Sequence, residues 1–343
     1  MLKIFIIKIN SLKIMQNFDK KKKLRFIRKF LILFIIVFIY FLLVYKFFEL
    51  SYLNSFFKLY INQQSKIRKF YDNKISIFTF WEPSTKFPGY LQLCINTWKR
   101  NIPNYNITIL DYSKLHKYLN SSIISKILCK NMTLPIQADA IRVAMLEKYG
   151  GIWMDIDIII TSFSFLKNVF KYDLAFYGNP QKKNPTISFI YASKNSRIMK
   201  EWLINIIKRV SIYKKLQSQK YNNLTNLCQW NYLGNGIINE LLKKSNEKEF
   251  IIFDWLKENA IPERNAFHAV GKMAAKGNFK IIEAYRNFYF YPGDPQKIIN
   301  NNTGIIFLHN SWTEKKYKYM SIIEFLRQNI MLSNLFKKLL EKE

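Results

Sequence analysis

The sequence is poor in the residues that mark several common protein classes. It has 343 residues, of which only 3 are cysteines, 10 are glycines and 9 are prolines. The cysteines (Cys94, Cys129 and Cys228) form no C-x-x-C pair and no cluster with histidine, so a structural zinc site is not expected. One disulfide plus a free thiol and three free thiols are both possible. The cysteines therefore do not show whether the protein is in an oxidising or a reducing compartment. The scarcity of glycine and proline argues against long disordered linkers.

Acidic residues are also scarce. The chain has 23 Asp and Glu against 54 Lys and Arg, which gives a formal net charge of +31. It has no RNA-binding signature, no zinc-finger spacing and no basic repeat that would turn this charge into nucleic-acid recognition. No nucleic-acid partner is therefore expected. A basic surface also suits anionic lipid headgroups and diphosphate ligands, and we prefer that interpretation.

One segment near the amino terminus lacks charge altogether. Residues 30–45 (FLILFIIVFIYFLLVY) are all apolar or aromatic. At 1.5 Å per residue a helix of this length spans about 24 Å, and the neighbouring apolar residues extend it toward the ~30 Å of a bilayer core. Signal-peptide cleavage needs small residues, but there is no glycine before Gly89 and no alanine before Ala138, so only serines such as Ser51 could serve. The sequence predicts an uncleaved transmembrane anchor at residues 30–48.

Lysines and arginines crowd the amino-terminal side of this anchor, between residues 20 and 29. The positive-inside rule then predicts a single-pass type II membrane protein, in a Golgi-type membrane if the cell is eukaryotic and in the inner membrane if it is bacterial. The expected organisation is a basic tail (1–29), the anchor (30–48), a stem (49–73), a catalytic domain (74–315) and a carboxyl-terminal amphipathic helix (316–343).

Beyond the stem, short apolar runs alternate with helical patterns, as in an α/β sheet domain. The expected strands are 75–80, 107–110, 152–160, 174–176, 187–191 and 305–309. The expected helices are 90–100, 136–149, 196–212 and 235–244. In the tail, residues 321–340 have apolar side chains at mostly helical intervals, which favours a helix that packs on the domain over a second membrane contact.

The most informative segment is IQADAIRVAMLEKYGGIWMDIDIIIT, residues 136–161. Helical spacing places Asp139 and Arg142 on one face, and the glycine pair that follows indicates a helix stop and a tight turn. Strand alternation would place Asp155 and Asp157 on one face of a buried strand. Two carboxylates there repel each other and are costly to desolvate, so a divalent cation is expected between them, and the oxygen ligands suit Mg²⁺ or Mn²⁺.

The pattern A-D-x-x-R-x-x-x-L-x-x-x-G-G-x-x-x-D-x-D resembles the D-x-D region of the capsular polysaccharide synthesis proteins and of the related family-32 glycosyltransferases. Residues 78–111 resemble the opening strand, tryptophan, helix and second strand of that group. The resemblance implies a GT-A fold, a Rossmann-like nucleotide-diphospho-sugar transferase domain. It also implies a UDP- or GDP-sugar donor, a glycan, polysaccharide or glycolipid acceptor, a Mn²⁺ or Mg²⁺ cofactor and a retaining reaction.

The same resemblance implies roles for single residues. Trp81 would stack on the nucleotide base, and Asp139 and Arg142 would hold sugar and ribose hydroxyls. Asp155 would contact the donor and the metal, Asp157 would ligate the metal, and both would be catalytic. In the late segment FLHNSWT, His309 would complete the metal coordination and Trp312 would contact the donor, whereas a structural histidine and a core aromatic are the alternatives. The loop at Gly234 could face the acceptor, although an ordinary turn is the simpler interpretation.

Two other functions remain open. Haloacid-dehalogenase phosphatases also have a D-x-D after an apolar strand, but they usually place Thr or Val two residues after the second Asp, where this chain has Ile159. Their D-x-D also normally opens the domain, whereas this one follows two expected strands. The second alternative is a membrane-anchored glycan-binding protein that has lost its activity, against which the complete set of acidic residues argues.

Overall fold

The computed structural model describes residues 75–341, except 130, 167, 220–230, 247, 256–278 and 300–303. The chain divides into two units, Met1–Asp72 and Asn73–Glu343, and the described residues all belong to the second. The predicted tail, anchor and stem therefore lie outside the described residues. Within those residues, no helix is both long and apolar enough to cross a membrane.

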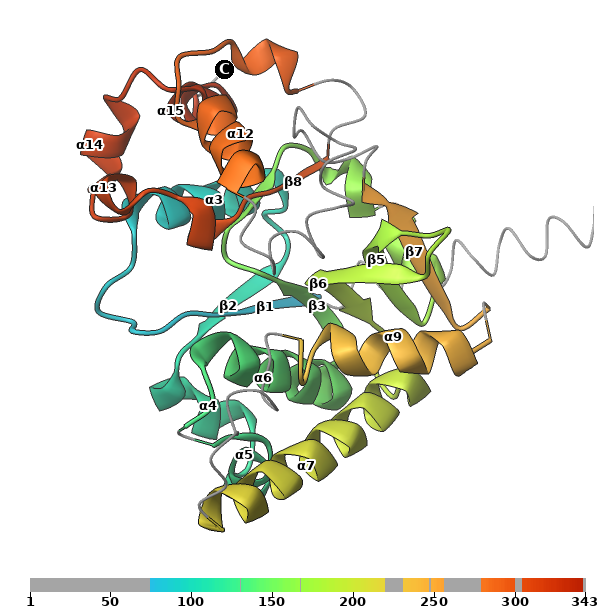
Figure 1. Ribbon diagram of the computed structural model, residues 1–343. Helices are drawn as coiled ribbons and strands as arrows, with labels where there is room; N and C mark the ends of the chain where they lie inside the picture. The colour runs from blue at the N-terminus through green and yellow to red at the C-terminus, as the bar shows by residue number, and fades with distance from the viewer. Residues whose placement is uncertain are drawn as a thin grey trace, which may run out of the picture. The chain divides into compact units, whose positions relative to one another are not determined.

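A six-stranded mixed sheet forms the centre of the second unit (Figure 1). Its strands lie in the order β2-β1-β3-β6-β5-β7. All neighbouring pairs are parallel except those that β6 makes with β3 and β5. The strands are β1 (Ser76–Phe80), β2 (Asn106–Leu110), β3 (Gly151–Met154), β5 (Leu174–Asn179), β6 (Asn184–Ala192) and β7 (Phe250–Asp254).

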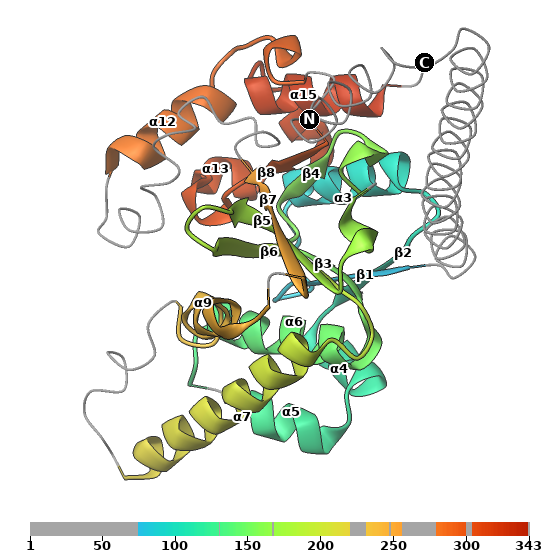
Figure 2. The same ribbon diagram turned by 90° about the vertical axis from the view of Figure 1, so that its right-hand side faces the viewer.

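Helices cover both faces of this sheet, as both views of the ribbon show (Figures 1 and 2). One face carries α4 (Tyr112–Tyr118), α5 (Ser121–Ile127), α6 (Leu134–Tyr149), α7 (Arg197–Ser218) and α9 (Asn235–Lys244). The other face carries α3 (Gly89–Asn101), α12 (Phe279–Tyr289), α13 (Lys315–Lys318), α14 (Ile322–Leu326) and α15 (Met331–Leu340). A two-stranded sheet of β4 (Ile158–Ile160) and β8 (Ile305–Phe307) lies on this second side, and the described 3₁₀ turns are η2 (Phe163–Leu166), η3 (Val169–Lys171), η5 (Pro295–Lys297) and η6 (Asn310–Trp312).

The expected diglycine turn connects α6 to β3. Gly150 ends the helix with a φ of 66° and Gly151 follows with a φ of 95°, values that L side chains rarely adopt. A Cβ atom on Gly151 would lie 2.5 Å from the carbonyl oxygen of Ser76 in β1. Two glycines are therefore needed to bring the chain from a buried helix directly into a central strand.

The expected strand 152–160 is wrong as a single element. The chain leaves the central sheet after β3, turns, and continues as β4, which pairs antiparallel with β8. Helix α3 holds β4 there: the Trp98 indole donates to the Ile158 carbonyl at 2.7 Å, and the Ile160 amide donates to the Thr97 hydroxyl at 3.1 Å. Alternation therefore does not continue through Asp155 and Asp157, which lie in the break between the two sheets.

The carboxyl-terminal segment 321–340 contains two helices rather than one. Ser321 and Glu324 form a capping box at the start of α14, and α15 begins after Ile330. The apolar residues of α15 are buried (Met331, Leu332, Leu335 and Phe336). The expectation that this segment packs on the domain is therefore confirmed for α15.

Candidate active site

The predicted site residues gather where the strand order reverses. From β1 the chain passes through α3 to β2 on one side, whereas after β3 it next enters the central sheet on the side of β6. Open α/β sheets bind ligands at such a point, beyond the carboxyl ends of the strands. Trp81 directly follows β1 and Asp155 directly follows β3, and these two strands are parallel neighbours.

The Asp155 carboxylate is held firmly by one of its oxygens. Oδ1 accepts a hydrogen bond from the Trp153 indole at 2.9 Å and lies 3.2 Å from Nη2 of Arg142. The Asp155 amide donates to the Ser188 carbonyl at 2.7 Å, which fixes the backbone. The side chain is 30% exposed, and its Oδ2 makes no hydrogen bond to another described residue. One oxygen is thus fixed, and no other described residue binds the second.

Arg142 is buried and binds several groups at once. Its Nη2 also pairs with Asp139 at 3.1 Å, its Nη1 donates to the Ile187 carbonyl, and its guanidinium carbon lies 5.3 Å from the centre of the Trp153 ring. Its Nε has no hydrogen-bond partner among the described residues. Only a planar guanidinium makes these contacts together. Arg142 therefore lies behind Asp155 and orients it.

Asp139 lies beside Arg142 on α6 and is also buried. Burial raises the pKa of Asp139 to about 7, the Asp155 charge adds to that shift, and Arg142 opposes it. A Cβ atom on Gly234 would lie 2.4 Å from the Asp139 carboxylate. Sequence reasoning favoured an ordinary turn at Gly234, but the structure places this glycine against a predicted site residue at the start of α9.

Asp157 lies at the far side of the turn that follows β3. The Ile158 amide donates to the Asp155 carbonyl at 3.2 Å and closes this turn. The segment after β8 then fixes Asp157 twice: the Asn310 amide donates to Oδ2 at 2.8 Å, and the Leu308 amide donates to the Asp157 carbonyl at 3.1 Å. Although the residue is partly exposed, its carboxylate is crowded by protein, and this burial, together with the Asp155 charge, raises the pKa of Asp157 to about 7.

His309 and Trp312 stack on each other beside Asn310. Their ring centres are 3.9 Å apart and their planes differ by 12°. Burial lowers the pKa of His309 to about 4, so the imidazole is neutral at pH 7. Among the described residues, no group of three or more His, Cys, Asp or Glu side chains is arranged to hold a metal ion. The Asn310 amide of this segment binds Asp157, and the imidazole of His309 stacks on Trp312. The metal role of His309 remains a prediction.

Trp81 forms the opposite border of the site. Its amide donates to the Leu110 carbonyl at 3.0 Å, which continues the pairing of β1 with β2. Its indole nitrogen donates to the Lys86 carbonyl at 3.2 Å, and its ring meets Phe87 edge-on. The side chain is partly exposed. These contacts fix a large aromatic surface next to the carboxyl end of β1.

The two aspartates fit a hard divalent cation without a third protein ligand. Each has one oxygen held by the protein and one that no other described residue binds. Mg²⁺ and similar ions often use one or two carboxylates and complete their shell with substrate phosphates and water. Burial lowers the pKa of the half-buried Lys318, and the Asp157 charge opposes that shift, so the ammonium group of Lys318 interacts electrostatically with Asp157.

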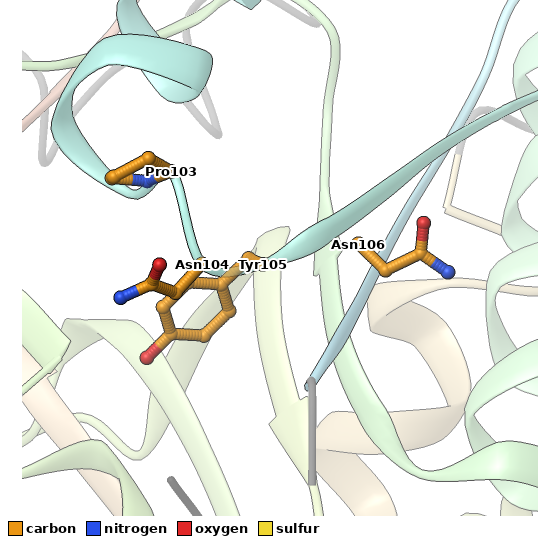
Figure 3. A pocket seen from close by; sticks show the side chains of 4 residues that line it. All are labelled: Pro103, Asn104, Tyr105 and Asn106. Carbon is orange, nitrogen blue, oxygen red and sulfur yellow. The ribbon is translucent and has the colours of Figure 1, made fainter. Parts of the chain in front are cut away.

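A hollow of about 360 Å³ lies elsewhere, lined by Pro103, Asn104, Tyr105 and Asn106 (Figure 3). Asn106 pairs with Ser76, so the hollow is at the amino ends of β1 and β2. Trp81 and Asp155 are at the opposite ends of their strands, and the hollow therefore does not belong to their site.

Comparison with known proteins shows the family of the chain. The family model described as capsular polysaccharide synthesis protein matches residues 45–319. No curated protein matches the chain. Several solved structures are similar. The PaToxG glycosyltransferase has 16% identity and a TM-score of 0.32, and the match covers 83% of this chain and 97% of that one.

A glycosyltransferase involved in the glycosylation of the major capsid of PBCV-1 has 10% identity and a TM-score of 0.33, with 72% of this chain and 98% of that one covered. The glycosyltransferase GlyE of Streptococcus pneumoniae TIGR4 has 10% identity and a TM-score of 0.36, with 79% and 61% covered.

This chain combines a mixed α/β domain, a carboxylate pair after a central strand and this family match. It is a glycosyltransferase. More particularly, the chain belongs to the capsular polysaccharide synthesis protein family. This membership selects a sugar-transferring enzyme over the phosphatase alternative.

Proposed function

We propose that this enzyme has a GT-A fold and transfers a hexose from a UDP- or GDP-sugar to a glycan, polysaccharide or glycolipid acceptor, with Mn²⁺ or Mg²⁺ and with retention of anomeric configuration. The observation that carries the proposal is the carboxylate pair Asp155 and Asp157 beyond the end of β3, where the strand order reverses. Each carboxylate is anchored through one oxygen and leaves the other for a ligand.

In this proposal the donor lies between Trp81 and the carboxylates of Asp155 and Asp157. Trp81 supplies an aromatic surface for the nucleotide base, since every base has a π-face that can stack. The sugar and ribose hydroxyls lie near Asp139 and Asp155, which Arg142 holds in fixed orientations through its guanidinium. Trp312 supports the site indirectly, because its ring packs against the ring of His309.

The chemical need of the reaction is to stabilise a leaving nucleoside diphosphate. A bound divalent cation supplies positive charge to that diphosphate. Asp155 and Asp157 hold the cation, and the nearby Lys318 adds positive charge on the protein side. Preorganised charge of this kind is usually the largest single contribution to such catalysis.

The test is release of nucleoside diphosphate from a panel of UDP- and GDP-sugars by the full-length protein, with Mn²⁺ and with EDTA. Wild type should act only with the metal, and Asp157→Asn should lose at least ~10²-fold in turnover, as expected for one preorganised electrostatic group. Asp173→Asn is the matched control, because Asp173 precedes β5 and so lies at the end of the strands opposite to Asp155. Equal wild-type activity in EDTA, or full Mn²⁺-dependent activity of Asp157→Asn, would contradict the metal assignment.

The membrane placement remains a prediction. We propose that residues 30–48 anchor the enzyme in the bilayer with type II topology, which would bring the catalytic domain close to a lipid-linked or membrane-bound acceptor. The support is the uncharged run at residues 30–45 and the basic residues before it.

A further inference from the structure

A chain of hydrogen bonds reaches Asp157 from the inside of the protein. The Tyr90 hydroxyl, on α3, donates to Oδ1 of Asn310. The backbone amide of the same Asn310 donates to Oδ2 of Asp157 at 2.8 Å. The three residues come from α3, from the segment after β8 and from the turn after β3, which are far apart in the sequence.

Tyr90 is well placed to hold the Asn310 segment in position. Its side chain is 0% exposed, and its ring stacks on Phe325 with centres 5.9 Å apart. A buried hydroxyl without a partner is costly, so the bond to Asn310 favours a single arrangement of both groups. Helix α3 cannot move easily, because Trp98 and Thr97 also bind β4.

The orientation of Asp157 depends on the position of one amide. Among the described residues other than Asp157 itself, Asn310 is the one whose backbone amide binds the Asp157 carboxylate. It binds Oδ2. With Oδ2 held, the carboxylate cannot rotate freely, and Oδ1 keeps one direction. A displaced Asn310 amide would release the carboxylate while leaving the aspartate itself intact.

We propose that Tyr90 is a positioning residue for Asp157: acting through Asn310, it presents the other carboxylate oxygen, Oδ1, to the divalent cation. This inference rests on the proposed metal-dependent transfer. Outer groups that orient a ligating carboxylate typically change metal affinity or activity by about 10- to 100-fold when they are removed. The effect should therefore be on metal affinity, with little change in turnover once the metal saturates the site.

The test compares Tyr90→Phe with Tyr213→Phe in the full-length protein. Both changes remove one hydroxyl from a buried tyrosine, and the Tyr213 hydroxyl binds the Asn131 carbonyl on the other face of the sheet. Electron paramagnetic resonance of free Mn²⁺ gives the dissociation constant without reference to activity. For Tyr90→Phe this constant should rise by roughly 10-fold, whereas Tyr213→Phe should keep the wild-type value. Thermal stability should fall by similar amounts in both.

Asn310→Ala extends the test, because it removes the acceptor of the Tyr90 hydroxyl and keeps the backbone amide. It should weaken Mn²⁺ binding as Tyr90→Phe does, and the double variant should be no weaker than either single variant. Wild-type Mn²⁺ affinity in Tyr90→Phe, or strictly additive effects, would overturn the inference alone. A wild-type protein that binds no Mn²⁺ and acts equally in EDTA would overturn the proposed function and this inference with it. If Tyr90→Phe does not fold, an unchanged affinity in Asn310→Ala would overturn the inference.

Discussion

Removing the charge of Asp157 should stabilise the metal-free protein. Its carboxylate is crowded by protein and lies close to the negative charge of Asp155, and both effects raise its pKa from 3.8 to about 7. Asparagine keeps the size of the side chain and can still accept the hydrogen bond from the Asn310 amide. Asp157→Asn therefore removes a destabilising charge and little else.

The size of the effect follows from the change in pKa. A folded-state pKa above the unfolded value means that the folded protein holds its proton more tightly, so folding loses stability as pH rises from about 4 to about 7. At 1.36 kcal/mol per pKa unit, the penalty above pH 7 is at most ~4 kcal/mol. Since ~1 kcal/mol corresponds to about 2–4 °C in a domain of this size, Asp157→Asn should melt a few degrees higher at pH 8 in EDTA. Near pH 4 the difference should disappear.

Thermal unfolding of the full-length protein between pH 4 and pH 8 measures this directly. Asp111→Asn provides a control of opposite sign, because hydrogen bonds from Lys114 and Ser113 lower the pKa of Asp111 to about 2. Its charge contributes stability above pH 4, which is lost as the pH falls toward 2, so Asp111→Asn should be less stable than wild type at pH 8. Adding Mn²⁺ should stabilise wild type and reduce the advantage of Asp157→Asn. Lower stability of Asp157→Asn at pH 8 in EDTA would refute the reasoning.

Two further substitutions test the borders of the site. Trp81→Ala should weaken the binding of UDP or GDP by ~1–3 kcal/mol, the range for stacking of a base on an aromatic ring, and titration calorimetry with Trp81→Phe as the control measures it; an unchanged affinity would move Trp81 out of the site. Gly234→Ala should place a methyl group 2.4 Å from the Asp139 carboxylate and 2.5 Å from Cδ1 of Ile187, and the overpacking should cost ~1–3 kcal/mol of unfolding free energy together with donor affinity. Alanine tolerated at Gly234 with normal melting and normal donor binding would contradict the close contact with Asp139.

Local patterns predicted the regular elements well. Residues 235–244 form the expected helix, and the expected helix 136–149 corresponds to α6, which begins two residues earlier. Hydrophobic periodicity and a diglycine stop determine these elements, and both are local properties. Strand β7 (Phe250–Asp254) was not predicted, although its parallel partner β5 was. Its apolar run is only four residues long (250–253) and is followed by Asp254, and its pairing with a distant strand makes it a strand.

The division of 152–160 shows where local patterns fail. The run Ile158–Ile160 continues the apolar character of β3, so nothing in its composition marks an end. This run instead pairs with β8 and forms hydrogen bonds with Trp98 and Thr97, which are contacts between residues about 60 to 150 positions apart in the sequence. The two aspartates were predicted on one face of a strand, and the tertiary structure places them in a turn instead.

The same long-range contacts explain why only part of the site could be predicted. Asp139, Arg142 and Asp155 were recognisable together because one helix, one turn and one strand connect them within 17 residues of sequence. Asn310 lies in the segment FLHNSWT, whose resemblance pointed to His309 and Trp312 but not to Asn310, because a backbone amide has no signature in a sequence. The described contacts of Asn310 connect Asp157 to the buried helix α3. If carboxylate orientation limits metal binding, residues without any recognisable motif determine part of the activity of this family member, and only the folded structure reveals them.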